Sequence, residues 1–285
     1  MKIRANLTFW AAQLLVLPIL GLTSAQGQER QPDQPLQLAE ARIIPGKEVT
    51  IQPDPRNPAN SYELFRTLLD ESQQTLDQMD GYCGMLTKQV RIDGELQEEE
   101  QMLVKIRHEP FSVYLKWEAD GQEALYVEGK HDNCVLARAT QGFAALKGVW
   151  KLEPDSRKAM QNNRYPVTEL GIKKMNERVT AFYDEHRTET MTCGHTINQI
   201  NGRPMIVFNI AFPSPQESPY STCEYQFDAE TKLLQSVIIC EWDYKGEPAG
   251  IAEKYVYSDL TLDKCPGEEE FDANNPEYSL AMDEE

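Results

Sequence analysis

The residues that could do chemistry are few and widely spaced. The four histidines are His108, His131, His186 and His195, and none of them lies in an HExxH zinc motif. Cys193 and His195 share one face of an expected strand, and His131 lies close to Cys134. Each pair supplies two ligands, whereas a zinc site needs three or four. The sequence favours a structural role for both pairs and predicts no metal site.

Catalytic motifs are missing as well. No serine lies in a GxSxG nucleophile elbow, and no glycine-rich loop could hold a phosphate. The run Glu98–Glu100 follows an expected turn and is typical of a solvated sheet edge. Because the chain has 46 Asp and Glu residues, two neighbouring carboxylates would say little about glycoside hydrolysis. We expect no catalytic residue, no cofactor and no enzymatic activity.

Six cysteines lie at wide spacings without a CxxC pair: Cys83, Cys134, Cys193, Cys223, Cys240 and Cys265. In an oxidising compartment this even number would allow disulfides. Cys223 and Cys240 flank an expected hairpin that turns at residues 228–232, which makes them the disulfide candidates. The pairing depends on strand register, because a slip of one residue would put the two side chains on opposite faces. Buried thiols are the alternative.

Large apolar residues recur at alternate positions of several expected strands, and we take them as the candidate ligand-binding residues. They are Phe111, Val113, Leu115, Trp117, Ile206, Phe208, Ile210, Ile238 and Trp242. A period of two places each stripe on one face of its strand. Two interpretations remain open at this point: the stripes fill a core against helices, or they line a cavity for an apolar ligand.

Helical and strand periods place these stripes in one sheet. Helices are expected at residues 61–80, 154–162 and 168–186. Strands are expected at 82–92, 98–107, 111–117, 123–128, 134–139, 146–152, 189–200, 204–212, 221–227, 233–244 and 251–260. Asp93-Gly94 and Asn201-Gly202 are hairpin turn signals. The expected fold class is α+β, an antiparallel sheet with helices packed on one face.

The first 25 residues predict a cleavable signal peptide. Lys2 and Arg4 precede an apolar run over residues 7–22, and Ala25 ends a small-residue cleavage site. The run is shorter than the roughly 20 residues of a membrane-spanning helix, so we expect no transmembrane segment after cleavage. Export would make the protein periplasmic or secreted. Residues 26–58 are expected to form a Pro-rich disordered linker, 59–278 one domain and 279–285 an acidic tail.

The strong negative charge limits the partners. The net charge of −18 becomes −20 when cleavage removes Lys2 and Arg4, and such a field repels nucleic acid. Residues 267–285 hold eight acidic residues and no Lys or Arg, which predicts a solvated, partly disordered tail. We therefore expect no nucleic-acid partner.

Five ordered blocks carry a family resemblance. They are PFSVYLKW (110–117), LYVEG (125–129), YPVTELGI (165–172), EKYVYSDL (253–260) and FDANNPEY (271–278). In these blocks, which span nearly the whole expected domain, the chain resembles the exported bacterial family catalogued as domain of unknown function 1571. That family in turn resembles the LolA/LolB/RseB superfamily, the lipoprotein-carrier-like proteins.

The resemblance implies a LolA-like half-barrel, a curved antiparallel sheet with helices on its concave face. Carriers of that superfamily shelter acyl chains between sheet and helices, which implies a non-enzymatic periplasmic binding protein for an apolar ligand, acyl chain or lipoprotein. The alternative is an envelope protein-interaction or stress-sensing module without a small-molecule ligand, because one relative uses the fold to bind protein partners. The family has no established catalytic residues to carry over.

We predict that export removes the first 25 residues, because the basic start, the apolar run and Ala25 together form a signal-peptidase substrate. The intact mass of the exported protein should give Gln26 as the first residue, or Gln28 if the enzyme cuts after Gly27. Exported protein that still begins at Met1 would contradict the assignment.

Overall fold

A computed structural model describes residues 58–146, 148–186, 188–263 and 266–281. The expected signal peptide, all but the last residue of the expected linker and the final four residues of the acidic tail lie outside the described residues.

The helices and strands follow the sequence periodicity closely. The α-helices are α1 (Pro58–Asp77), α2 (Gly142–Leu146) and α3 (Ile172–His186). The strands are β1 (Gly81–Ile92), β2 (Glu95–Leu96), β3 (Glu100–Arg107), β4 (Ser112–Trp117), β5 (Glu123–Val127), β6 (Val135–Arg138), β7 (Val149–Leu152), β8 (Thr192–Ile200), β9 (Arg203–Ala211), β10 (Tyr220–Asp228), β11 (Leu234–Trp242) and β12 (Pro248–Thr261). Among the described helices, none is long and apolar enough to cross a membrane.

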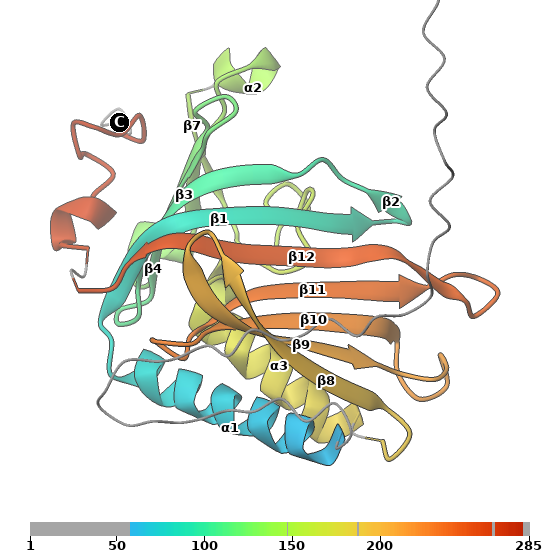
Figure 1. The fold of residues 1–285 in the computed structure, drawn as a ribbon. Coiled ribbons are helices and arrows are strands. Elements are labelled where there is room, and N and C mark those ends of the chain that lie inside the picture. The colour runs from blue at the N-terminus through green and yellow to red at the C-terminus, as the bar shows by residue number, and fades with distance from the viewer. Residues whose placement is uncertain (1–57, 147, 187, 264–265, 282–285) are drawn as a thin grey trace, which may run out of the picture. The chain divides into compact units, whose positions relative to one another are not determined.

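One antiparallel sheet holds all the strands. Its order is β7-β6-β5-β4-β3-β1-β12-β11-β10-β9-β8, and the short β2 pairs with β1. Two meanders, one before and one after α3, are therefore joined where the long strands β1 and β12 pair at the centre. Figure 1 shows the sheet curving, with α1 and α3 on the same face. The predicted fold class, a curved antiparallel sheet with helices on its concave face, is confirmed.

Local turn chemistry sets the strand register. Asp93 and Gly94 both have positive φ, as do Asn201 and Gly202, which is the geometry of a two-residue hairpin turn. The second turn pairs Ile200 with Arg203 and starts the β8–β9 ladder. Because side chains alternate across a strand, this register decides which residues reach the concave face.

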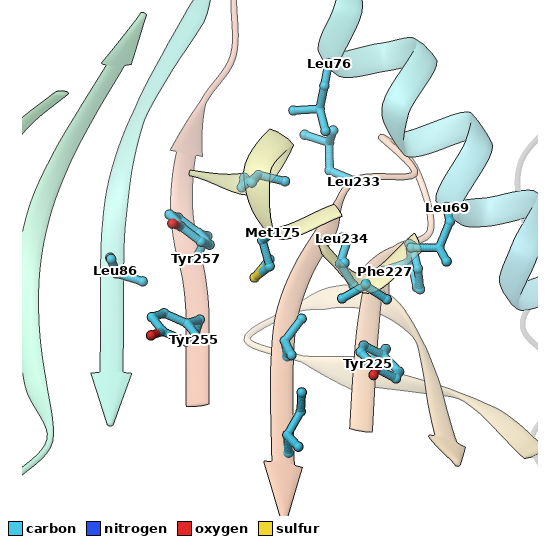
Figure 2. Close-up of a cluster of buried hydrophobic side chains, with 14 of the residues drawn as sticks. Leu69, Leu76, Leu86, Met175, Tyr225, Phe227, Leu233, Leu234, Tyr255 and Tyr257 are labelled. Carbon is cyan, nitrogen blue, oxygen red and sulfur yellow. The ribbon is translucent and has the colours of Figure 1, made fainter. Parts of the chain in front are cut away.

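Aromatic and aliphatic side chains from the two long helices fill one half of the concave face. Phe65 of α1 is fully buried, with ring centroids 5.4 Å from Phe208 and 5.0 Å from Tyr225. Figure 2 shows the same core further along, where Leu69 of α1 points toward Phe227 and Leu76 of α1 toward Leu233, while Met175 of α3 lies over the strands. Packing of this kind leaves no room for a ligand under α1.

The segment between β7 and α3 differs from the prediction. A short helix was expected over 154–162, but residues 153–171, which we call the strap, form turns and a 3₁₀ turn at Val167–Glu169. The Ser156 hydroxyl donates to the carbonyl of Glu153, and the Asn163 amide donates to the carbonyls of Ala159 and Gln161. Such local side-chain bonds compete with helix formation.

The longer helix starts four residues later than expected, at Ile172 instead of Thr168. Gly171 has φ of +111°, and a Cβ there would lie 3.0 Å from Cδ1 of Ile106. Only glycine fits this position, and its conformation separates the 3₁₀ turn from the helix.

The C-terminal segment is not the solvated tail that its charge suggested. Phe271, Ala273 and Leu280 are buried against Tyr114, Leu125, Val127 and Leu136, which form a second core on the face of the sheet opposite the helices. Tyr278 stacks on Tyr114 with a centroid distance of 3.9 Å. Lys105 and Arg107 of β3 pair with Glu270 and Glu268. The acidic residues therefore neutralise strand cations while the apolar residues between them are buried.

Replacement of Phe271 by alanine should lower the free energy of unfolding by about 3–5 kcal/mol, because a fully buried ring leaves a cavity in the second core. Urea denaturation of Phe271→Ala measures the loss, and Glu277→Ala, at an exposed position of the same segment, is the control. An unchanged midpoint for Phe271→Ala would show that the segment does not pack on the sheet in solution.

Candidate functional site

The other half of the concave face contains a hollow. A cross-strand row runs from Leu115 through Ala124 and Ala137 to Trp150, with each residue the register partner of the next. Two neighbouring alanines in the middle of this row leave a space that larger side chains would fill. The resulting cavity has a volume of ≈ 400 Å³ and is open at one side.

Mainly apolar side chains line the hollow. They are Leu86, Met102, Leu115, Trp117, Ala124, Val135, Ala137, Trp150 and Leu152 from the strands, with Val167 and Leu170 from the strap. The volume lies within the range of small-molecule sites, and such sites are mostly apolar. The hollow is therefore the best candidate for a binding site in the described part of the chain.

Polar contacts hold the strap over the hollow. The Lys88 ammonium group, buried on β1, donates to the carbonyl of Asn162 at 3.2 Å and to Oδ1 of Asn163 at 2.6 Å. It also pairs with Glu100 at 2.6 Å, and Glu100 accepts a hydrogen bond from Nε1 of Trp117. These polar groups of the hollow's wall thus satisfy one another.

The predicted site residues separate into different surroundings. Leu115 and Trp117 line the hollow, and Phe111 lines a neighbouring cavity of ≈ 420 Å³ beside the start of α3. Val113 is fully buried between them. The β9 residues Ile206, Phe208 and Ile210 lie in the filled core under α1, and Trp242 packs at its margin while Nε1 donates to the carbonyl of Ser218.

Ile238 was placed on the wrong face. Val237 and Ile239 belong to the concave core, so Ile238 between them points to the opposite face, opposite Glu224 and Lys254 in the ladders. The expected strand over 233–244 has apolar residues at both odd and even positions, so alternation alone could not show which set faces the core.

The predicted Cys223–Cys240 disulfide is wrong for the same reason. Cys223 pairs with Ile239 in the ladder, while Cys240 pairs with Thr222. The two sulfurs therefore lie on opposite faces of the sheet, and both thiols are free, as are those of Cys134 and Cys193. Burial raises the pKa of the Cys193 and Cys223 thiols to about 12, which keeps both protonated and unreactive at neutral pH.

The histidines take structural positions in the described residues. Nδ1 of His195 lies 2.9 Å from the Ser61 hydroxyl and Nδ1 of His108 lies 2.7 Å from the carbonyl of Met79. Burial lowers the pKa of both imidazoles. His131 begins a short 3₁₀ turn, and His186 ends α3. Within the described ranges, no three His, Cys, Asp or Glu residues gather as a metal site would require.

Sequence reasoning missed the residues that make the hollow. Ala124 and Ala137 are small residues in ordinary strand patterns, and only their cross-strand pairing creates the space. Trp150 lies in an expected strand, yet nothing in its own sequence neighbourhood places it beside Ala137. Predicting the hollow from the sequence would have required the pairing register of four neighbouring strands.

Comparison with protein families identifies the chain. Residues 79–280 match the model of the family described as "Protein of unknown function (DUF1571)". The match covers well over half of the sequence, so the chain belongs to this family, as the sequence blocks suggested. A comparison with curated proteins gives no match.

Solved structures similar to this chain include the following three. One is a putative outer membrane lipoprotein-sorting protein domain from Vibrio parahaemolyticus, with 13% identity, coverage of 72% of this chain and 96% of that chain, and a TM-score of 0.34. A LolA superfamily protein from Nitrosomonas europaea has 8% identity, coverage of 73% and 96%, and a TM-score of 0.30. The Mycobacterium tuberculosis lipoprotein LppX has 10% identity, coverage of 70% and 98%, and a TM-score of 0.39.

A carboxylate introduced at Leu115 should be tolerated better than one in the filled core. Leu115→Glu can direct its charge into the open hollow, so we expect a loss of about 1–2 kcal/mol in unfolding free energy. Phe208→Glu would bury an unpaired charge among aromatic rings and should cost more than about 4 kcal/mol. Denaturant titration of both variants compares them, and equal losses would argue that the hollow is closed to water.

Proposed function

We propose that this member of the DUF1571 family is a non-enzymatic binding protein that shelters an apolar chain, such as an acyl chain, in the hollow under the strap. The observation that carries the proposal is the pair of alanines, Ala124 and Ala137, which leaves space between Leu115 and Trp150. A fold that only needed a core would gain stability from larger side chains at these two positions.

The chemistry of the wall supports an apolar occupant. Each methylene removed from water contributes about 0.8 kcal/mol, so a chain of several methylenes binds without polar recognition. The buried Lys88 ammonium group and the half-buried Glu100 carboxylate beside the hollow are already paired with each other. Water would find few free partners on the apolar strand residues.

The strap supports reversible access to the hollow. Its ties to the sheet at Lys88 are two hydrogen bonds, and most of its own side chains are only partly buried. Segments with few buried apolar contacts open at lower free energy than a packed core. The proposal includes export to the periplasm, which the first 25 residues predict, and where acyl chains need shelter from water.

Filling the hollow should abolish binding without loss of stability. We expect wild-type protein to bind a fluorescent fatty acid and Ala137→Phe to lose this binding, because the new ring occupies the space between Leu115 and Trp150. The melting temperature of Ala137→Phe should be unchanged or higher, since the ring fills a void.

The matched control is Ala119→Phe, which adds the same ring at an exposed turn position and should keep full binding. Wild-type protein that binds no apolar probe, or Ala137→Phe that binds it as well as wild type, would reject the proposal. The envelope interaction module would then become the better hypothesis.

A further inference from the structure

A separate cavity lies on the other side of Tyr165, between α3 and strands β10–β12. It has a volume of ≈ 270 Å³, and Glu185 and His186 are among its lining residues. Five aromatic rings contribute to its wall: Tyr165, Phe182, Tyr220, Tyr225 and Tyr255. The Phe182 and Tyr220 centroids lie 5.4 Å apart, and those of Tyr165 and Tyr255 lie 6.2 Å apart.

A buried carboxylate belongs to the same wall. The Glu253 side chain on β12 is only 4% exposed, and its Oε2 atom makes no hydrogen bond within the described residues. The other oxygen, Oε1, accepts a 3.3 Å hydrogen bond from the Tyr165 hydroxyl. Leaving a buried carboxylate oxygen without a donor is costly, so the position calls for a partner that brings one.

The nearby arginines do not supply that donor. Nε of Arg164 is 3.8 Å from Oε2 of Glu253, beyond hydrogen-bond distance, while Nη1 of Arg164 donates to the carbonyl of Ala252. The Arg178 guanidinium lies over the Tyr165 ring at 4.0 Å and donates to the carbonyl of Glu169. Both guanidinium groups give hydrogen bonds to backbone carbonyls, and Arg164 contributes to Glu253 an ion pair without a hydrogen bond.

The charged groups at the cavity balance one another. Arg178, Glu185 and Glu253 belong to its lining, and Arg164 forms an ion pair with Glu253, so two guanidinium groups stand against two carboxylates. Burial raises the pKa of the Tyr165 and Tyr255 hydroxyls, so both rings remain neutral phenols. Neutral aromatic faces attract cations through the ring quadrupole.

We propose that this cavity binds an organic ammonium group, held by the aromatic rings and by Oε2 of Glu253. The ammonium nitrogen donates the hydrogen bond that Oε2 lacks. Alkyl carbons attached to the nitrogen contact Phe182 and Tyr220. This site is distinct from the proposed acyl hollow and does not depend on it.

Calorimetric titration of the exported chain with butylammonium tests the assignment, with n-butanol as the uncharged probe of similar shape. We expect butylammonium to bind at least about tenfold more tightly than n-butanol, and Glu253→Gln to remove that difference. Glutamine keeps the size of the side chain and removes a buried charge, so the variant should fold. Equal affinity for the two probes, or unchanged butylammonium binding by Glu253→Gln, would overturn the proposal.

A second pair of variants tests the rings independently of Glu253. Tyr220→Leu keeps an apolar wall but removes one π face, and it should weaken butylammonium binding several-fold, whereas Tyr220→Phe should retain it. Equal binding by both Tyr220 variants and wild type would contradict the aromatic part of the site. If Glu253→Gln fails to fold, this pair decides the question.

Dodecylammonium distinguishes a lipid from a small amine as the source of the group. The natural ligand could be one amphiphile whose ammonium group lies in this cavity and whose alkyl chain passes Tyr165 into the hollow. In that case dodecylammonium should bind more tightly than butylammonium, and Ala137→Phe should remove the gain in affinity. If the natural ligand is a small amine, the two probes should bind alike. Ala137→Phe leaves butylammonium binding intact in both cases, so failure of the acyl hollow and failure of the ammonium site give different results.

Discussion

Helix α3 begins at the middle of the sheet because two buried tyrosine hydroxyls hold its first amide groups. Ile172 N–H donates to the Tyr82 hydroxyl at 2.7 Å, and Gly171 N–H donates to the Tyr257 hydroxyl at 3.0 Å. Both tyrosines lie on the paired central strands β1 and β12 and are almost fully buried. Amide groups of a first helical turn have no partner within the helix, so this buried start requires acceptors from the sheet. This anchored start of α3 fixes where the helix and the preceding strap lie on the concave face.

The segments before and after Ile172 cover different halves of the sheet. Toward β10–β12 the chain continues as α3, whose apolar face packs beside α1 and fills that half of the concavity. Toward β3–β7 it leads back through the strap, which has turns in place of a helix and presents few large apolar side chains. One half is therefore packed to the density of a core, while the other is covered but not filled. The hollow over Ala124 and Ala137 is the consequence of this asymmetry.

Most of the fold could be predicted because local signals agree with one another. Alternation in Phe111–Trp117 and the Asn201-Gly202 turn each specify a strand or a hairpin without reference to the rest of the chain. The errors occurred where the sheet face of a side chain, or packing between distant segments, could not be inferred from the local sequence. Cys240 and Ile238 lie on a strand that is apolar at both parities, so only the ladder shows their face. The site depends on still more distant information, because the space beside Leu115 results from the pairing of four strands.

Tyr165 separates two cavities that make opposite demands on a ligand. On the hollow's side, Lys88 pairs with Glu100, Glu100 accepts a hydrogen bond from Nε1 of Trp117, and most of the strand residues in the lining are apolar. On the α3 side, the aromatic wall contains Glu253, whose Oε2 has no hydrogen-bond donor in the described residues. Burial raises the pKa of the Glu253 carboxyl, and the charge of Arg164 opposes that rise. The ion pair with Arg164 leaves Oε2 without a hydrogen bond, which is costly for a buried carboxylate. Tyr165 belongs to the lining of both cavities, so the strap that carries it borders both.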